Sequence, residues 1–472
     1  MEGSSDSNVI ESIIHKEKLS KRVKANERAE IITSKLPESL ITHILSFLPA
    51  KDAVRTSVLS KKWIHLWTSI TKLVLDDSVF YSSKRKTSAK QHFANFVYRV
   101  LLLNKSPSIE SFSLVITGKY GVSMFNTWMS GILERNVKIL HVCSHFEVDL
   151  NTYASYSLFE CKVLEELVLK MISIIRVPPI AFVHFGHLKF LKLSSTVFVL
   201  DSSSSSEDLT LSLPVLKVFE TIHCSWLNVN SVTLKAPLLE SVLIEHDPNV
   251  TFYEMDLIIK ISASRLTKFT FCCYGFISQH VVLLDPLSAQ NAFANIVLSR
   301  CEDHSISETR SNASLLLRQF SEVKYLKFDG SEVLPLSESN VAILPVYRML
   351  SHLELGLVTT EFLFALLLRS PVLKSLAFKG IIKFENEILN SATVPHCMTS
   401  TLQLVKFGNV HGLEHELCLA KFVMENGLVM QRMSFSLASP GLAQSKIIED
   451  FKEKLFSFKK SFSFAIVEFS CD

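Results

Sequence analysis

Apolar residues between positions 36 and 70 form three short segments with helical spacing. In the first segment they lie on one helical face between Pro37 and Pro49, at Leu40, Ile44, Leu45 and Leu48. The second segment has the same spacing at Val54, Val58 and Leu59. The third, which Ser60 can cap, has it at Trp63, Leu66, Trp67 and Ile70. Three helices this short enclose little core, so their surplus of apolar surface predicts that something else covers them.

A second pattern, with apolar residues at positions i, i+3 and i+5, recurs along the middle of the chain. Its copies begin at Ile109, Val137, Leu164, Leu188, Leu216, Leu239, Leu266, Phe293, Val323, Leu350, Leu373 and Leu402. They start roughly 23 to 30 residues apart, which is the range of leucine-rich repeats. The last two positions of each copy alternate on a short strand and point inward, while the first anchors the turn before it.

Stacked copies of this unit bury their apolar faces together, which predicts a curved solenoid with a parallel sheet on its concave side. The outward positions of the strands then line the concave face. The substrate-binding residues that we predict there are His141, Lys192, Glu220, Tyr325, Lys327, His352 and Glu354. Their mixture of aromatic side chains and both charge signs favours a protein partner, because a nucleic-acid surface would be mostly basic.

Past about residue 386 the repeat period fades, and a small α/β unit is predicted to close the solenoid. Strands are expected in "LQLVKFGN", "MQRMSFSL" and "SFAIVEF", and helices in "GLEHELCLAKFVMENG" and "LAQSKIIEDFKEKLFSF". The first of these helices places Leu413, Leu417, Ala420 and Met424 on one face, and Gly427 ends it. Two polar runs, "SSKRKTSAKQH" (82–92) and "DSSSSSED" (201–208), are interpreted as solvated loops.

Composition and charge narrow the class of protein. The 49 basic and 46 acidic residues give a net charge of +3, so the chain has no global preference for nucleic acid. The nine cysteines are scattered, which suits a reducing compartment, either the cytosol or the nucleus. Residues 1–30 are polar and expected to be disordered. The longest apolar runs, such as Phe362–Leu368, are too short to cross a bilayer, so no membrane is expected.

Catalytic and metal-binding motifs are not evident. The sequence holds no G-x-S-x-G, no H-E-x-x-H and no phosphate-binding glycine loop. In "HVCSH", His141, Cys143 and His145 alternate as metal ligands could, but we interpret them as outward residues of a strand. We therefore predict a protein without catalytic residues, metal or cofactor.

Three stretches resemble a known family. "LPESLITHILSFLPAKDAVRTSVLSKKWIHLWTSI" is similar to the plant-type F-box, and the repeats resemble those of plant F-box/leucine-rich-repeat proteins. "VPHCMTSTLQLVKFGNVHGLEHELCLAKFVMENGLVMQRMSF" resembles the FBD domain, although the tryptophan usual before V-P-x-C is missing. The expected fold is α/β, with a three-helix F-box, a leucine-rich-repeat solenoid and an α/β FBD cap. The expected boundaries are a disordered N-terminus at 1–30, the F-box at 31–75, a linker or start of the solenoid at 76–100, the repeats at 101–385 and the FBD at 386–472.

The resemblance implies a receptor subunit of an SCF (Skp–cullin–F-box) ubiquitin ligase. Its F-box would bind a Skp-type adaptor, and through it a cullin, while the repeats and FBD hold an unknown target protein. The adaptor-binding residues carried over by position are Leu36, Pro37, Leu40, Ile44, Leu48, Val58, Leu59, Trp63 and Trp67.

Among these nine residues the tryptophans are expected to be the anchors. Alternatively, some of the nine, Ile44 and Leu59 especially, could form the internal core of the three helices. Two alternatives to the ligase receptor stay open. One is a repeat scaffold whose F-box is vestigial or serves another complex, and the other is a co-receptor that binds a small molecule.

Overall fold

The computed structural model describes most of the chain in two compact units, residues 1–166 and 167–472. Its described residues are 36–59, 61–81, 86–178, 185–200, 207–246, 257–274, 279–285, 287, 291–299, 306–334, 344–385, 387, 389, 393–438, 445–459 and 466–471. The predicted disorder of residues 1–30 and the serine run 202–206 lie outside these residues.

The first unit begins with short helices that match the predicted segments only in part. Helix α2 (Glu38–Leu45) starts after Pro37, and α3 (Ala50–Arg55) starts after Pro49, because a proline ring suits the entry to a helix. The remaining turns are 3-10 helices: η1 (Thr56–Val58), η2 (Lys61–Trp63) and η3 (Leu66–Ser69). The prediction of a continuous third helix was therefore wrong.

Three parallel strands and three helices complete the first unit. The strands are β1 (Lys72–Asp76), β2 (Ser111–Ile116) and β3 (Ile139–Ser144), paired in register. After β1 comes the 3-10 turn η4 (Ser78–Phe80), and the helices are α4 (Lys86–Leu103), α5 (Val122–Leu133) and α6 (Thr152–Glu160). Helix α4 corrects the prediction of a basic loop for residues 86–92, while 82–85 lie outside the described residues. Its buried side begins inside the basic run at Ala89 and continues with Phe93, Ala94, Val97 and Val100.

A buried carboxylate joins β1 to the turn that follows β2. Asp77 is fully buried and accepts hydrogen bonds from the backbone N–H of Thr117 (2.8 Å) and Gly118 (2.9 Å). The hydroxyls of Thr117 (2.6 Å) and Tyr120 (3.2 Å) also donate to it. A buried charge is tolerated when it is fully hydrogen-bonded, so Asp77 fixes the ends of these two strands.

The second unit is built on a long parallel sheet. Its strands follow one another in the order β4 (Glu166–Val177), β5 (Phe190–Leu200), β7 (Val218–Ile222), β10 (Ser241–His246), β12 (Lys268–Tyr274), β14 (Phe293–Ser299), β15 (Tyr325–Asp329), β16 (His352–Thr359), β17 (Ser375–Lys383), β18 (Leu404–Val410), β19 (Arg432–Leu437) and β20 (Ile466–Cys471). The short β8 (Ser225–Leu227) pairs with the end of β5. The parallel sheet predicted from the repeats is confirmed.

The inward positions of the repeats are buried as predicted, with one shift of frame. The strand pairs align Leu326 of β15 with Ala294, and Phe328 with Ile296. The repeat predicted at Phe293/Ile296/Leu298 is therefore two residues out of frame, and Phe293 points outward, half-buried. A small alanine at the inward position concealed the correct frame.

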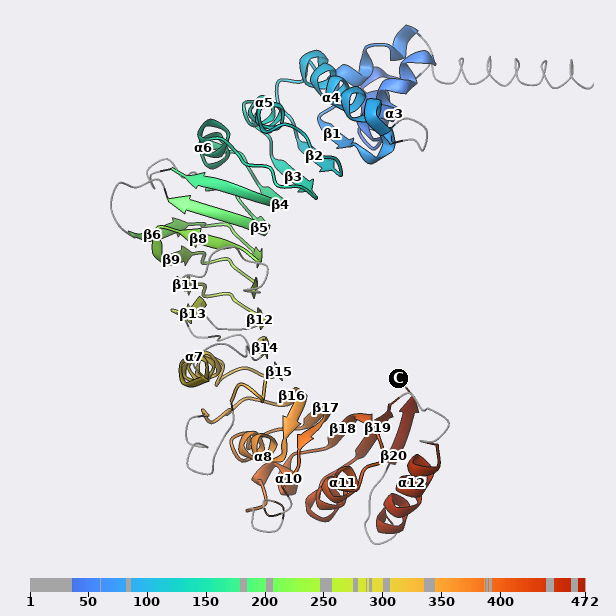
Figure 1. The fold of residues 1–472 in the computed structure, drawn as a ribbon, viewed down its shortest axis with the longest axis vertical. Coiled ribbons are helices and arrows are strands. Elements are labelled where there is room, and N and C mark those ends of the chain that lie inside the picture. The colour runs from blue at the N-terminus through green and yellow to red at the C-terminus, as the bar shows by residue number, and fades with distance from the viewer. Residues whose placement is uncertain are drawn as a thin grey trace, which may run out of the picture. The chain divides into compact units, whose positions relative to one another are not determined.

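A second sheet and several helices cover one face of the long sheet, the face to which the inward repeat residues point (Figure 1). The second sheet has the order β13 (Gln279–Leu283), β11 (Leu257–Ser262), β9 (Val229–Lys235) and β6 (Glu207–Ser212). Helices α7 (Ile306–Arg318), α8 (Thr360–Leu368), α10 (His396–Ser400), α11 (Glu414–Asn426) and α12 (Ser445–Lys459) take over along the chain. Strand β6 includes Glu207 and Asp208, so the end of the predicted serine-rich loop is a strand.

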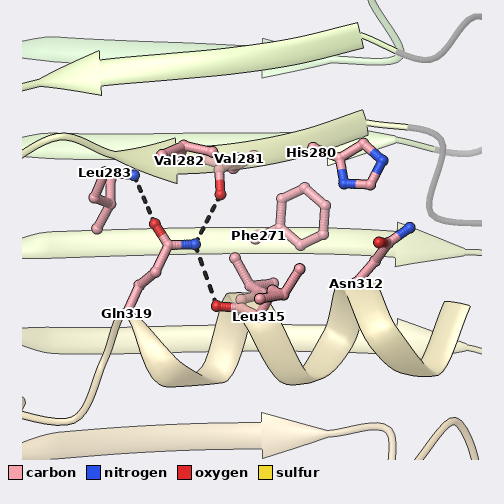
Figure 2. Close-up of a pocket in the computed structure, with 9 residues that line it drawn as sticks. Phe271, His280, Val281, Val282, Leu283, Asn312, Leu315 and Gln319 are labelled. Carbon is pink, nitrogen blue, oxygen red and sulfur yellow. Dashed lines mark hydrogen bonds between the residues drawn. The ribbon is translucent and has the colours of Figure 1, made fainter. Parts of the chain in front are cut away.

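The change from strands to helices leaves β13 as an edge strand beside α7 (Figure 2). The side-chain amide of Gln319 occupies this edge: its Nε2 donates to the Val281 carbonyl at 2.8 Å, and its Oε1 accepts from the Leu283 N–H at 2.6 Å. A glutamine amide presents the same donor and acceptor as a peptide group, so Gln319 satisfies the edge as one residue of a further strand would.

The C-terminal region continues the long sheet from β17 through β18, β19 and β20, with one register shift between β18 and β19. The predicted strands and helices are present there, and α11 ends at Gly427 as expected. The predicted face of α11 is confirmed in part, because Ala420 and Met424 are buried while Leu417 is half-buried and Leu413 is exposed. Glu416, Leu419 and Val423 complete the buried face.

Candidate protein-binding surfaces

The N-terminal helices expose six large apolar side chains, which we call the N-terminal apolar face. Their exposed fractions are 43% for Leu40, 42% for Ile44, 70% for Phe47, 87% for Val58, 56% for Leu59 and 42% for Ile64. Helix α2 packs inward through Ile41 and Leu45 instead, both of which are fully buried. Its apolar sector is therefore wider than its core requires, and the surplus faces solvent, which is typical of a surface that another protein covers.

Both tryptophans of this region lie in the interior. Trp63 is 7% exposed and Trp67 is 8% exposed. Their expected role as anchors of adaptor binding stays a prediction, although little of either side chain is exposed. The alternative that Ile44 and Leu59 form the core is wrong, since both are exposed. Helical spacing indicates which residues share a face, but it does not tell which of two adjacent faces is turned to the core.

The remaining predicted adaptor-binding residues outside the N-terminal apolar face differ in their exposure to solvent. Pro37 is exposed, and Leu36 and Leu48 are half-buried. The Nζ of Lys62 donates to the Leu36 carbonyl at 2.6 Å, which ties the start of α2 to η2. Sequence reasoning missed Phe47 and Ile64. Each is a large apolar residue that does not belong to the predicted apolar face of its segment, and such a residue could have indicated an exposed contact.

The long sheet of the second unit carries its outward residues in continuous rows, and we call this surface the ladder face. Because neighbouring strands are parallel and in register, residues at equivalent positions stand side by side. One row runs Lys192, Glu220, Leu243, Thr270, Asn295, Lys327, Glu354, Ala377, Lys406, Ser434 and Glu468. Six of the seven predicted substrate-binding residues lie on this face, in this row or the row before it.

These predicted residues pair with one another across adjacent strands. Lys192 forms an ion pair with Glu220 at 3.2 Å, and Lys327 forms one with Glu354. In the preceding row the rings of Tyr325 and His352 stack at 4.4 Å. Partial burial, together with the nearby charges of two lysines, holds the pKa of His352 below its usual range, so this ring is neutral at pH 7.

The seventh residue, His141, lies on the outward side of β3 in the first unit. Its Nε2 contacts the Glu166 carboxylate at 2.8 Å. His145 follows the end of β3, and its Nδ1 lies 3.3 Å from the Ile116 carbonyl. Within the described residues no group of three or more His, Cys, Asp or Glu side chains is placed to hold a metal ion.

Sequence reasoning missed a groove on the ladder face over β16, β17 and β18. The groove has a volume of about 670 Å³, and the residues that line it are Glu354, Leu355, Leu357, Ala377, Phe378, Lys379, Lys406, Gly408 and Asn409. Lys379 forms an ion pair with Asp329 at 2.9 Å, two strands away, across Gly356. A side chain at position 356 would collide with the Asp329 carboxylate, so glycine is required for this contact.

A smaller cavity of about 310 Å³ lies beside the edge of β13, where Phe271, Leu315 and Leu316 form its apolar part (Figure 2). It lies where the second sheet meets α7, and Gln319 lines it together with Val281 and Leu283, to which Gln319 is hydrogen-bonded. Among the described helices none is long and apolar enough to span a bilayer.

Comparison with known proteins adds the family. Residues 33–75 match the family model of the F-box domain, and residues 390–435 match the model of the FBD. The chain is 30% identical over 469 residues to an F-box/FBD/LRR-repeat protein of Arabidopsis thaliana, which covers 95% of this chain and 97% of that relative. The chain belongs to the F-box/FBD/LRR-repeat family.

Two further Arabidopsis thaliana proteins are also similar to this F-box protein. An F-box/LRR-repeat protein is 28% identical, covering 74% of this chain and 92% of the relative. An FBD-associated F-box protein is 27% identical, covering 89% and 95%. The N-terminal apolar face falls within the F-box match, and β18 and β19 fall almost wholly within the FBD match.

Proposed function

We propose that this F-box protein is the target-recognition subunit of an SCF ubiquitin ligase. The observation that carries the proposal is the N-terminal apolar face, which lies inside the F-box and is exposed in the isolated chain. A Skp-type adaptor would cover this face and connect the chain to a cullin, while the ladder face would hold the target protein. The proposed place of work is the cytosol or the nucleus.

In this role the chain performs no bond chemistry. A thioester-bearing conjugating enzyme, held elsewhere on the cullin, supplies the activated ubiquitin. The receptor holds a lysine of the target near that thioester, which turns an encounter between two molecules into a reaction within one complex. The rate gain therefore depends on how firmly the F-box and the ladder face bind their partners.

The test is binding of a purified Skp-type adaptor to the full chain, measured by co-elution and by titration. Leu59→Asp should abolish the complex, because it places a charge in an apolar contact while replacing a side chain that is already half exposed. Leu428→Asp is the matched control, since Leu428 is 75% exposed but lies in the FBD.

Wild-type chain that ignores the adaptor would refute the proposal, as would equal loss of binding in both variants. An adaptor complex that never recruits a cullin would favour instead the scaffold with an F-box that serves another assembly.

A further inference from the structure

We propose that the groove over β16, β17 and β18 receives an acidic segment of the target, in which an aspartate or glutamate stands beside an apolar side chain. This inference rests on the proposed function, because it names the chemistry of the protein that the receptor would hold. The groove belongs wholly to the second unit.

Two glycines bring neighbouring groups close together beside this groove. Gly356 and Gly408 are outward residues of β16 and β18, on either side of β17. A Cβ at Gly408 would lie 2.9 Å from the Phe378 carbonyl oxygen and 3.1 Å from the Lys379 Cα, so this position accepts only glycine without a shift. The register of β18 with β19 shifts by one residue between Phe407 and Val410, and Asn409 in this interval has a φ of 46°. A bulge of this kind bends a strand and re-aims its side chains.

The charges around the groove leave one cation available. Lys327 is paired with Glu354, and Lys379 is paired with Asp329. Lys406 stands next to Ala377 on the neighbouring strand, is exposed, and has no acidic partner among the described residues. Lys379 is also accessible, since its side chain is 59% exposed and its ammonium has three donors, of which Asp329 uses one.

A single carboxylate fits this arrangement better than a phosphate group does. The three lysines and two carboxylates of this area leave a net charge of one, which one carboxylate neutralises. The lining contains no arginine, whose planar fork is the usual reader of the phosphate dianion. The carboxylate would lie in the groove between Lys379 and Lys406, both of which line it.

The same groove offers an apolar surface beside the cations. Leu357 is 45% exposed at the rim, and Ala377 presents only a methyl group between Glu354 and Lys406. An apolar side chain adjacent to the acidic residue would pack on these two residues, which excludes water from the charged contact and strengthens it.

The ladder face supplies its own matched control. Lys268 on β12 is also exposed and outward, and it too has no ion-pair partner among the described residues. It lies five strands from Lys406 in the sheet order, or about 24 Å at the usual strand spacing. Lys268→Glu and Lys406→Glu therefore change the net charge of the face equally, but only the second changes the groove.

The experiment uses the full chain and three pools of 12-residue peptides, identical except for a fixed central pair within random flanks. The pairs are Leu–Glu, Leu–phosphoserine and Leu–Lys, and retained peptides are identified by affinity selection with mass spectrometry. A retained Leu–Glu peptide is then titrated by fluorescence anisotropy. We expect Lys406→Glu to weaken it roughly fivefold to thirtyfold. The affinities of Lys406→Arg and Lys268→Glu for the peptide should remain within about twofold of the wild-type value, because the first keeps the positive charge and the second lies outside the groove.

Preference for the phosphoserine or lysine pool, or no preference, would overturn the inference, as would equal loss in Lys268→Glu and Lys406→Glu. The Leu59→Asp chain separates this inference from the proposed function. It should still bind the peptide, because its substitution lies in the first unit. Failure of adaptor binding with intact peptide binding refutes the proposed function alone, and the reverse result refutes the groove alone.

Discussion

Trp63→Ala should mainly reduce the stability of the F-box, whereas Leu59→Ala should mainly reduce its affinity for the adaptor. Trp63 is buried, so Trp63→Ala leaves a large cavity and should cost about 3–5 kcal/mol of unfolding free energy. Leu59 is 56% exposed, so Leu59→Ala should change stability by less than about 0.5 kcal/mol.

Adaptor binding should depend directly on the exposed residues Val58 and Leu59, and only indirectly on the buried Trp63. Full burial of a leucine or valine is worth about 1.5–3 kcal/mol, and a partner can bury only the part that is exposed. Val58 is 87% exposed, so Val58→Ala with Leu59→Ala should remove roughly 2–4 kcal/mol of binding free energy, or about 30-fold to 800-fold in affinity.

Thermal unfolding and adaptor titration on the same samples measure the two effects. The double alanine variant should keep the melting temperature of the wild type and lose affinity. Trp63→Ala should melt early, and any loss of binding should follow the unfolded fraction. If Trp63→Ala keeps its melting temperature but loses the adaptor, the tryptophan is a direct contact and the assignment of the exposed face is wrong.

Four further outcomes are expected. Asp77→Ala should cost about 3–5 kcal/mol in urea unfolding of the first unit, because it strands the buried donors that the carboxylate accepts from. Gln319→Ala should cost about 1–3 kcal/mol and speed hydrogen exchange of the Leu283 amide, since β13 loses its edge partner. Burial raises the pKa of Cys224 to about 11 and that of Cys397 to about 12, so in native protein at pH 8 mass spectrometry should find both alkylated last. The lowered pKa of His352 means that the unfolded chain binds its proton more readily, so stability should fall as pH drops below about 6.5, and an NMR titration should place the midpoint under that value.

The repeat pattern predicted the long parallel sheet because burial acts on every copy in the same way. The same triplet also describes the strands on either side of the predicted array. Ile70/Leu73/Leu75 precedes it and Met430/Met433/Phe435 follows it, and all six residues are buried. The first copy lies at the end of the F-box match and the second at the end of the FBD match, so the sheet extends into both domains.

The binding surfaces were harder to predict, because exposure depends on tertiary packing. A helical wheel for α2 groups Leu40 and Ile44 with Leu45, yet only Leu45 enters the core. The groove beside Lys406 is lined by residues of three strands, β16, β17 and β18, which no local sequence pattern brings together. An alignment of the repeats by their inward residues places Lys192 beside Glu220 and Lys327 beside Glu354. These two ion pairs can therefore be predicted from the sequence.

The most direct test of the proposed ligase role is the composition of the complex that the full chain forms in cells of a species that carries this family. Tagged wild-type chain, purified after proteasome inhibition, should carry a Skp-type adaptor and a cullin in amounts close to its own. The Leu59→Asp chain should lose both, while Leu428→Asp keeps both. A wild-type chain that is recovered folded and without adaptor or cullin would contradict the assignment to a ubiquitin ligase.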